Sequence, residues 1–126
     1  GCFSKEAAFE HQDIFQANFV PYANVIPQCK AVVHHGGIGT SAQCLRAGVP
    51  QLIAPWGVDQ WDNSMRLRDL GVALEINEHD LLTEKIKYKL ASLLSDNQIR
   101  FNTHRMANHE DDYKGVERGV EYLLDF

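Results

Sequence analysis

One short stretch of this 126-residue chain combines residue types that can bind an anion. It reads VHHGGIGTS over residues 33–41. Its glycines, Gly36, Gly37 and Gly39, let the backbone turn tightly and leave no Cβ between it and a ligand. A helix that begins directly afterwards offers unpaired N–H groups and the positive end of its dipole. Together with the Thr40 hydroxyl and a histidine ring, these groups predict a phosphate site.

This stretch differs from two common phosphate-binding motifs. No lysine follows the glycines, as a P-loop would require, and Ala42 stands where a G-x-G-x-x-G fingerprint has its third glycine. Neighbouring residues on a strand point to opposite faces, so His34 and His35 are not expected to share a metal ion. We expect one of the two to pack or to support the site. The other histidines show no zinc-binding spacing, and the sequence predicts no metal site.

A second polar motif, PWGVDQWDN, spans residues 55–63. Asp59 offers a carboxylate acceptor and Gln60 an amide that both donates and accepts, which suits the hydroxyls of a sugar. Alternatively, Asp59 caps the helix that follows. Trp56 and Trp61 can stack on a sugar or pack apart from it, and we expect at least one of them in the core or an interface.

Alternating strands and helices must position these two motifs. Apolar runs predict strands over residues 14–20, 30–34, 49–54 and 72–76, and a short helical turn over residues 23–28. Helices are predicted over residues 40–47, with Thr40 as N-cap and Gly48 as its stop, and over residues 60–70, ending at Gly71. This order predicts an α/β fold, a Rossmann-like open parallel sheet with helices on both faces. Ligands bind such sheets at the carboxyl ends of the strands.

The rest of the chain is expected to be helical. One apolar helical face is predicted from Leu82, Ile86, Leu90, Leu93 and Leu94, and another from Val116, Val120, Leu123 and Leu124. We therefore expect one domain over residues 1–126, irregular over 1–13, alternating over 14–76 and mainly helical over 77–126.

Composition narrows the class of protein. The 12 Lys and Arg against 17 Asp and Glu give a net charge of -5, which argues against a nucleic-acid binder and an anionic-membrane surface protein. Three cysteines with no C-x-x-C spacing indicate a reducing compartment, so we expect a cytoplasmic protein. The apolar runs are too short to span a bilayer, and no signal peptide is visible. The first residue is Gly, so we expect a processed or excised piece.

Residues 19–74 read FVPYANVIPQCKAVVHHGGIGTSAQCLRAGVPQLIAPWGVDQWDNSMRLRDLGVAL. This text resembles the donor-binding C-terminal domain of GT-B glycosyltransferases, in the UDP-sugar-dependent superfamily, nearest to its bacterial macrolide and antibiotic and its sterol glucosyltransferase branches. The resemblance implies diphosphate contacts from His35, Gly37, Gly39 and Thr40, sugar contacts from Asp59 and Gln60, and nucleoside contacts from Phe19, Val20, Val25 and Gln43. Asn63 completes the family's DQ-x-x-N pattern.

The resemblance also implies the reaction, which is metal-independent transfer of a hexose from a UDP-sugar to an acceptor hydroxyl, without a cofactor. The family's general base comes from the N-terminal acceptor-binding domain. We therefore expect no catalytic residue in this chain, and no activity from the chain alone. Gln43 replaces the ribose-binding glutamate of plant members, and the stretch FVPY replaces their Trp and Gln. The nucleotide, UDP or TDP, is therefore left open.

The sequence leaves three alternative functions open. The chain can be a donor-binding subunit that works with a separate partner polypeptide. It can also be a non-catalytic module that binds a nucleotide-sugar, or a sugar-nucleotide epimerase of related fold. The Asp59–Gln60 pair at this spacing favours a transferase over an epimerase.

Overall fold

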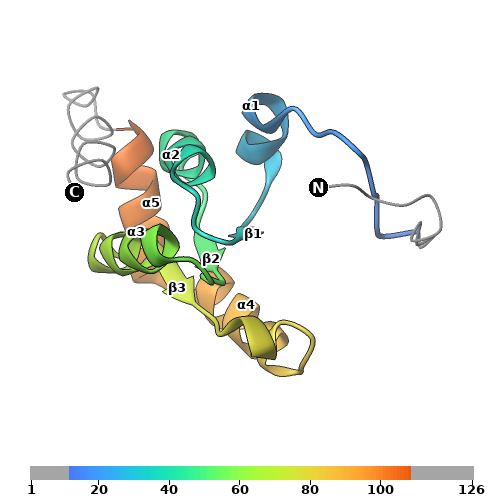
Figure 1. The fold of residues 1–126 in the computed structure, drawn as a ribbon. Helices are drawn as coiled ribbons and strands as arrows, with labels where there is room; N and C mark the ends of the chain where they lie inside the picture. The colour runs from blue at the N-terminus through green and yellow to red at the C-terminus, as the bar shows by residue number, and fades with distance from the viewer. Residues whose placement is uncertain (1–11, 109–126) are drawn as a thin grey trace.

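The computed structural model describes residues 12–108. The predicted apolar face that begins at Val116 lies outside this range. Three strands are described, β1 (Val32–His34), β2 (Gln51–Ile53) and β3 (Ala73–Glu75). They form a parallel sheet in the order β1-β2-β3 (Figure 1). The parallel sheet confirms the predicted topology, although each strand is shorter than the apolar run that predicted it.

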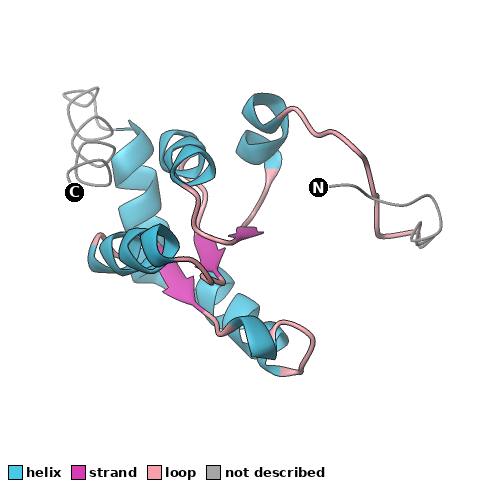
Figure 2. Cartoon of the chain, viewed as in Figure 1, coloured by secondary structure: helices cyan, strands magenta, loops and turns pink. Residues whose placement is uncertain are grey.

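Helices follow each strand (Figure 2). The helical elements are α1 (Tyr22–Val25), η2 (Ile26–Gln28), α2 (Ile38–Ala47), α3 (Val58–Asp69), η3 (Glu78–Asp80), α4 (Lys85–Ser95) and α5 (Asn97–Asn108). The first two confirm the helical turn predicted over residues 23–28. None of the described helices has the length and apolar character needed to cross a membrane.

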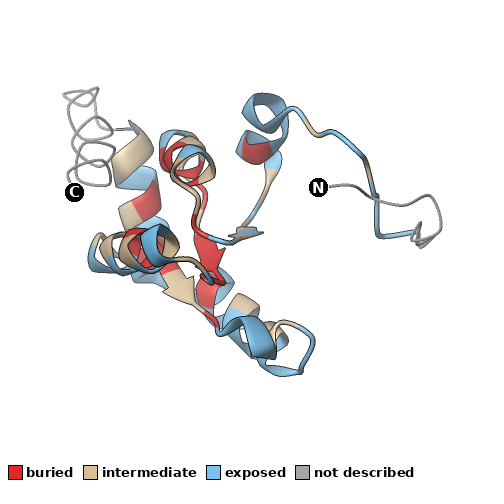
Figure 3. Cartoon of the chain, in the orientation of Figure 1, coloured by how far each residue is buried: buried red, intermediate tan, exposed pale blue. Residues whose placement is uncertain are grey.

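The helices cover both faces of the sheet, as predicted. On one face, Ile53 of β2 packs with Leu45 of α2 and Leu67 of α3. On the other face, Leu52 packs with Leu93 of α4 and Ile99 of α5. Figure 3 shows that the central strand β2 is buried throughout, and that the other buried residues lie mainly on the inward sides of these helices. The short strands are therefore fixed by apolar contacts from two layers of helix.

Two predicted helix starts are wrong. The N-cap of α2 is Gly37, whose carbonyl accepts the Ser41 N–H at 3.0 Å, so Thr40 is the third residue of the helix rather than its cap. The N-cap of α3 is Gly57, so the alternative of Asp59 as a cap is also wrong. The C-terminal prediction for α2 is confirmed, because Gly48 takes the left-handed conformation with φ 69°.

The strand predicted over residues 14–20 is wrong. Ile14 is an isolated bridge residue, and the rest of the segment has no regular structure. Phe15 is 91% exposed and Phe19 is 82% exposed. The apolar residues Ile14, Phe19 and Val20 do not alternate with a period of two, so they cannot form one buried face of a strand.

The apolar face predicted for residues 82–94 is confirmed only in part. Ile86, Leu90 and Leu93 pack against the sheet. Leu82 is fully exposed because it precedes the start of α4 at Lys85, and Leu94 is exposed because it lies about 100° around the helix from Leu93.

Two thiols lie in the described chain. Cys29 and Cys44 are both free. Cys44 of α2 is buried against Ile26 of η2. This burial raises the pKa of its thiol to about 12, so the thiol stays protonated.

Candidate functional site

The turns that follow β1 and β2 meet at the carboxyl edge of the sheet. Asn63 of α3 reaches across and donates from Nδ2 to the Gly36 carbonyl at 2.9 Å. A Cβ on Gly36 would lie 3.1 Å from the Gln60 carbonyl oxygen, so the two turns touch. The structure thus brings together the diphosphate motif and the sugar motif predicted from sequence.

Gly36 is the tightest point of the first turn. Its φ of 95° is a conformation that side chains disfavour, and an added Cβ would lie 3.0 Å from Ile53 Cγ2. Its N–H donates to His34 Nδ1 at 3.0 Å. The peptide groups on both sides of Gly36 are therefore fixed by hydrogen bonds from β1 and α3. We call residues 35–40 the glycine turn.

His35 lies over the glycine turn. Its side chain is exposed, and its Cε1 would be 2.9 Å from a Cβ on Gly37. A side chain at position 37 would therefore displace the imidazole from its place over the turn. His34 points the other way, into the space beneath α2, as expected for neighbours at a strand end.

The N-terminus of α2 is open. The N–H groups of Ile38, Gly39 and Thr40 precede the first hydrogen bond of the helix, and no side chain of the described chain caps it. A Cβ on Gly39 would meet nothing within 4 Å. Three unpaired N–H groups and the helix dipole therefore face open space next to His35. This arrangement favours a bound anion.

Gln60 folds back over the start of α3, where the N–H groups of Val58 and Asp59 precede the first hydrogen bond of the helix. Gln60 Oε1 accepts from the N–H groups of Trp56 and Gly57, at 3.1 Å each. The amide oxygen is thereby used, and the Gln60 Nε2 remains as the donor. Asp59 is exposed and holds its carboxylate outside the helix. The pair therefore offers one donor and one acceptor to a ligand, rather than the two-way amide inferred from sequence.

The tryptophans of this motif do not enter the core. Trp56 is 69% exposed and Trp61 is 46% exposed. The predicted core packing is wrong, because the turn places both rings outside the clusters that join α3 to the sheet. Packing of either ring in an interface stays a prediction.

The predicted nucleoside residues are spread over three elements. Gln43 is one turn after Thr40 on α2, on the same helical face, and its Oε1 is buried without a hydrogen-bond partner. Val25 ends α1, and the neighbouring η2 packs on α2 through Ile26. Phe19 and Val20 lie in the loop before α1, outside that apolar cluster. The structure thus brings Gln43 to the glycine turn but does not bring Phe19 or Val20 to it.

Three polar side chains beneath the glycine turn are almost completely buried. Ser41 donates from Oγ to the Gly37 carbonyl at 2.8 Å, and Gln51 joins His34 to α2. Asn63 is the third. The sequence argument did not predict the roles of Ser41 and Gln51. A glutamine at the start of an otherwise apolar strand was the available indication, because buried polar groups need partners.

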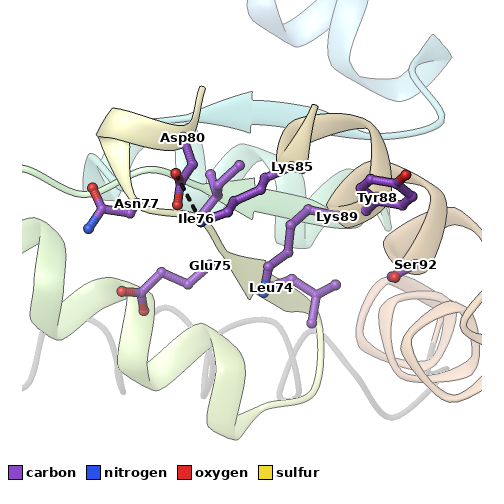
Figure 4. A pocket seen from close by; sticks show the side chains of 9 residues that line it. All are labelled: Leu74, Glu75, Ile76, Asn77, Asp80, Lys85, Tyr88, Lys89 and Ser92. Atoms are coloured by element: carbon purple, nitrogen blue, oxygen red, sulfur yellow. Dashed lines mark ion pairs between the residues drawn. The ribbon is translucent and has the colours of Figure 1, made fainter. Parts of the chain in front are cut away.

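A cavity of about 560 Å³ lies elsewhere, between β3 and α4. Figure 4 shows Lys85 at its rim, paired with Asp80 at 3.4 Å. Its lining comprises Leu74, Glu75, Ile76, Asn77, Asp80, Lys85, Tyr88, Lys89 and Ser92. None of the site residues predicted from sequence belongs to this cavity, and its acidic and basic side chains are balanced. We therefore place the candidate site at the glycine turn.

Comparison with known proteins now decides the family. Residues 9–112 match the family model described as erythromycin biosynthesis protein CIII-like, C-terminal domain. The chain belongs to this family. Its relatives include glycosyltransferases of antibiotic biosynthesis and sterol glucosyltransferases, which confirms the resemblance drawn from sequence.

Two relatives illustrate the range of sequence identity and coverage. The aklavinone 7-beta-L-rhodosaminyltransferase of Streptomyces galilaeus is 38% identical over 77 residues, which cover 61% of this chain and 17% of that protein. A sterol 3-beta-glucosyltransferase of Pichia angusta is 41% identical over 113 residues, or 90% of this chain and 9% of that protein. The chain therefore spans less than a fifth of the length of either relative.

Solved structures agree on the fold. The glycosyltransferase VinC in complex with dTDP matches with a TM-score of 0.73 and 28% identity, over 96% of this chain and 32% of VinC. The spinosyn forosaminyltransferase SpnP matches with a TM-score of 0.75 over 98% of this chain and 31% of its own. At 22% identity, the second match shows the fold alone. The α/β Rossmann-like fold is thus that of GT-B glycosyltransferases.

Proposed function

We propose that this chain binds the nucleotide-diphosphate sugar donor of a hexose-transferring glycosyltransferase. The observation that supports this most is the uncapped N-terminus of α2, which faces open space beside His35 at the carboxyl edge of the sheet. This N-terminus suits a diphosphate although the chain is acidic overall, because main-chain N–H groups supply the donors.

In this proposal the glycine turn binds the diphosphate. The N–H groups of Gly39 and Thr40, the Thr40 hydroxyl and the His35 ring donate to its oxygens, and Gly37 leaves room for the ring. Negative charge grows on the diphosphate as the sugar departs. Donors already fixed in position stabilise that charge without reorganising, which lowers the barrier to transfer.

The sugar and the nucleoside contact the neighbouring elements. Asp59 accepts from sugar hydroxyls, and the Gln60 Nε2 donates to one of them. The buried, unpartnered Oε1 of Gln43 is suited to accept from a ribose hydroxyl. Val25, with Phe19 and Val20 from the preceding loop, contacts the base.

The finer features of the reaction belong to the same proposal. We infer a UDP-sugar donor from the sequence. TDP is the competing nucleotide, because VinC was solved with dTDP. The acceptor and the general base are expected from a separate acceptor-binding domain or partner subunit. The transferase names of the relatives favour this function over an epimerase.

Titration of the 126-residue chain with UDP and with TDP, followed by amide NMR, tests the proposal. Either diphosphate is expected to shift the signals of Gly37, Gly39 and Thr40, and UDP-glucose is expected to shift that of Gln60 as well. The uridine or thymidine nucleoside alone is expected to shift none of them. As a control, the Lys87→Gln variant, which loses an exposed ion pair on α4, should show the same shifts as the unsubstituted protein. Shifts confined to Leu74 to Asn77 and Tyr88 would contradict the proposal, because they would place the ligand in the β3–α4 cavity.

A further inference from the structure

We propose that His34, held as the neutral tautomer with its proton on Nε2, is the positioning residue of the glycine turn for diphosphate binding. This inference rests on the proposed function. It assigns a role to the first histidine of the pair, whereas the proposed contact to the diphosphate comes from His35.

The hydrogen-bond chain fixes the tautomer from both ends. The Ser41 carbonyl can only accept, so it is the amide nitrogen of Gln51 that faces it, at 3.4 Å. The Gln51 Oε1 therefore faces His34 and must accept from Nε2, at 2.7 Å. At the other end, the Gly36 N–H can only donate, so His34 Nδ1 must be its unprotonated acceptor, at 3.0 Å. The two requirements agree on one neutral form of the ring.

The network acts on the groups that would meet the ligand. Gly36 is held at its N–H by His34 and at its carbonyl by Asn63, in a conformation with φ of 95°. Its two neighbours, His35 and Gly37, carry the proposed diphosphate contact and the N-cap of α2. A change in the Gly36 peptide would therefore turn the His35 ring and the first amides of α2 away from a common target.

The surroundings of His34 keep it neutral. Burial lowers the pKa of His34, and this effect exceeds the opposing effect of the hydrogen bond to Gln51; the charge of His35 lowers it further. The groups bonded to His34 from β2 and from the turn, Gln51 and Gly36, are uncharged. Protonation at Nδ1 would remove the acceptor of the Gly36 N–H.

Two substitutions distinguish the contributions of the two ring nitrogens of His34. His34→Asn places an amide oxygen near the position of Nδ1 and keeps an acceptor for Gly36. His34→Gln reaches the position of Nε2 and keeps the contact with Gln51, but leaves the Gly36 N–H without a partner. Isothermal titration of the full chain with UDP is expected to show affinity about tenfold weaker for H34Q and within about twofold of the unsubstituted protein for H34N.

Further readouts distinguish positioning from a merely structural role. As the pH falls from 6.5 toward the lowered pKa of His34, the affinity for UDP is expected to fall more steeply in the unsubstituted protein than in H34N, since the asparagine does not titrate. A long-range ¹H–¹⁵N spectrum of the unsubstituted protein should show the His34 proton on Nε2. Equal UDP affinities for H34Q and the unsubstituted protein, equal losses in both variants, or a proton on Nδ1 would each overturn the inference. Failure of the unsubstituted protein to bind UDP or TDP would instead refute the proposed function, and the inference with it.

Discussion

The two strand-to-helix turns at the carboxyl edge of the sheet begin alike and end differently. Each follows a strand of three residues, and each has an extended glycine as the N-cap of the next helix, Gly37 before α2 and Gly57 before α3. In the second turn Gln60 folds back and accepts from the N–H groups of Trp56 and Gly57. In the first turn His34 Nδ1 accepts from the Gly36 N–H, and no side chain of the described residues accepts from the N–H of the N-cap, Gly37.

The two turns therefore differ in the groups that they can offer to a ligand. An open helix N-terminus supplies main-chain donors and a positive dipole end, which suit phosphate oxygens. The start of α3 adds two polar side chains to its own main-chain donors, the Asp59 carboxylate and the Gln60 amide nitrogen, which suit hydroxyls. Adjacent turns of one sheet thereby differ in the polar side chains that they present beside their main-chain donors.

The largest expected effect concerns the shape of the first turn. Gly36→Ala should destabilise the protein by about 3 kcal/mol, because it combines a positive φ with a Cβ close to Ile53 and the Gln60 backbone. Urea denaturation measures the change in the free energy of unfolding.

Gly39→Ala is the matched control within the same turn. Its Cβ would meet nothing within 4 Å, and alanine favours a helix over glycine by about 0.5–1 kcal/mol, so stability should rise. Affinity for UDP should nevertheless fall, since the methyl group enters the proposed diphosphate site. Equal destabilisation by both substitutions would show that the turn is not shaped as described.

An intermediate effect is expected where the second turn loses the side chain that folds back over it. Gln60→Ala removes the acceptor of the Trp56 and Gly57 N–H groups and should cost about 1 kcal/mol in the free energy of unfolding. Gln60→Glu keeps a carboxylate acceptor for them and should preserve stability.

The Gln60→Glu variant also tests the proposed contact between Gln60 and the sugar. Gln60→Glu lacks the Nε2 donor, so the ratio of UDP-glucose affinity to UDP affinity should fall, as isothermal titration can measure. An unchanged ratio would count against a sugar contact from Gln60.

The smallest expected effect is a pH dependence of folding. Because burial lowers the pKa of His34 from 6.5, the unfolded chain takes up this proton at higher pH than the folded chain does. The stability that the neutral ring contributes is therefore complete above about pH 6.5 and is lost as the pH falls toward the lowered pKa. Urea denaturation from pH 7.5 to 5 should show a shallower decline in H34N than in the unsubstituted protein, and identical slopes would disprove this contribution.

The sequence by itself determined the alternation of strands and helices and the position of the glycine turn, while the ligand of that turn stays a prediction. These features depend on neighbouring residues, such as an apolar run that ends at glycines, and on Gly48 as the stop of α2. The same local reasoning placed a strand over residues 14–20 and an N-cap at Thr40, and both predictions were wrong. A strand needs a buried face, and a cap depends on which carbonyl accepts the first helical N–H.

The tertiary structure alone decided which histidine faces outward, which side chains fold back onto the two turns and which polar groups are buried beneath the glycine turn. His34 bonds to Gln51, 17 residues away, and Gly36 to Asn63, 27 residues away. Such pairings depend on the order of the strands and on the helices packed over them. The residue types permit them, but only the folded sheet brings donors and acceptors from separate turns within hydrogen-bonding distance.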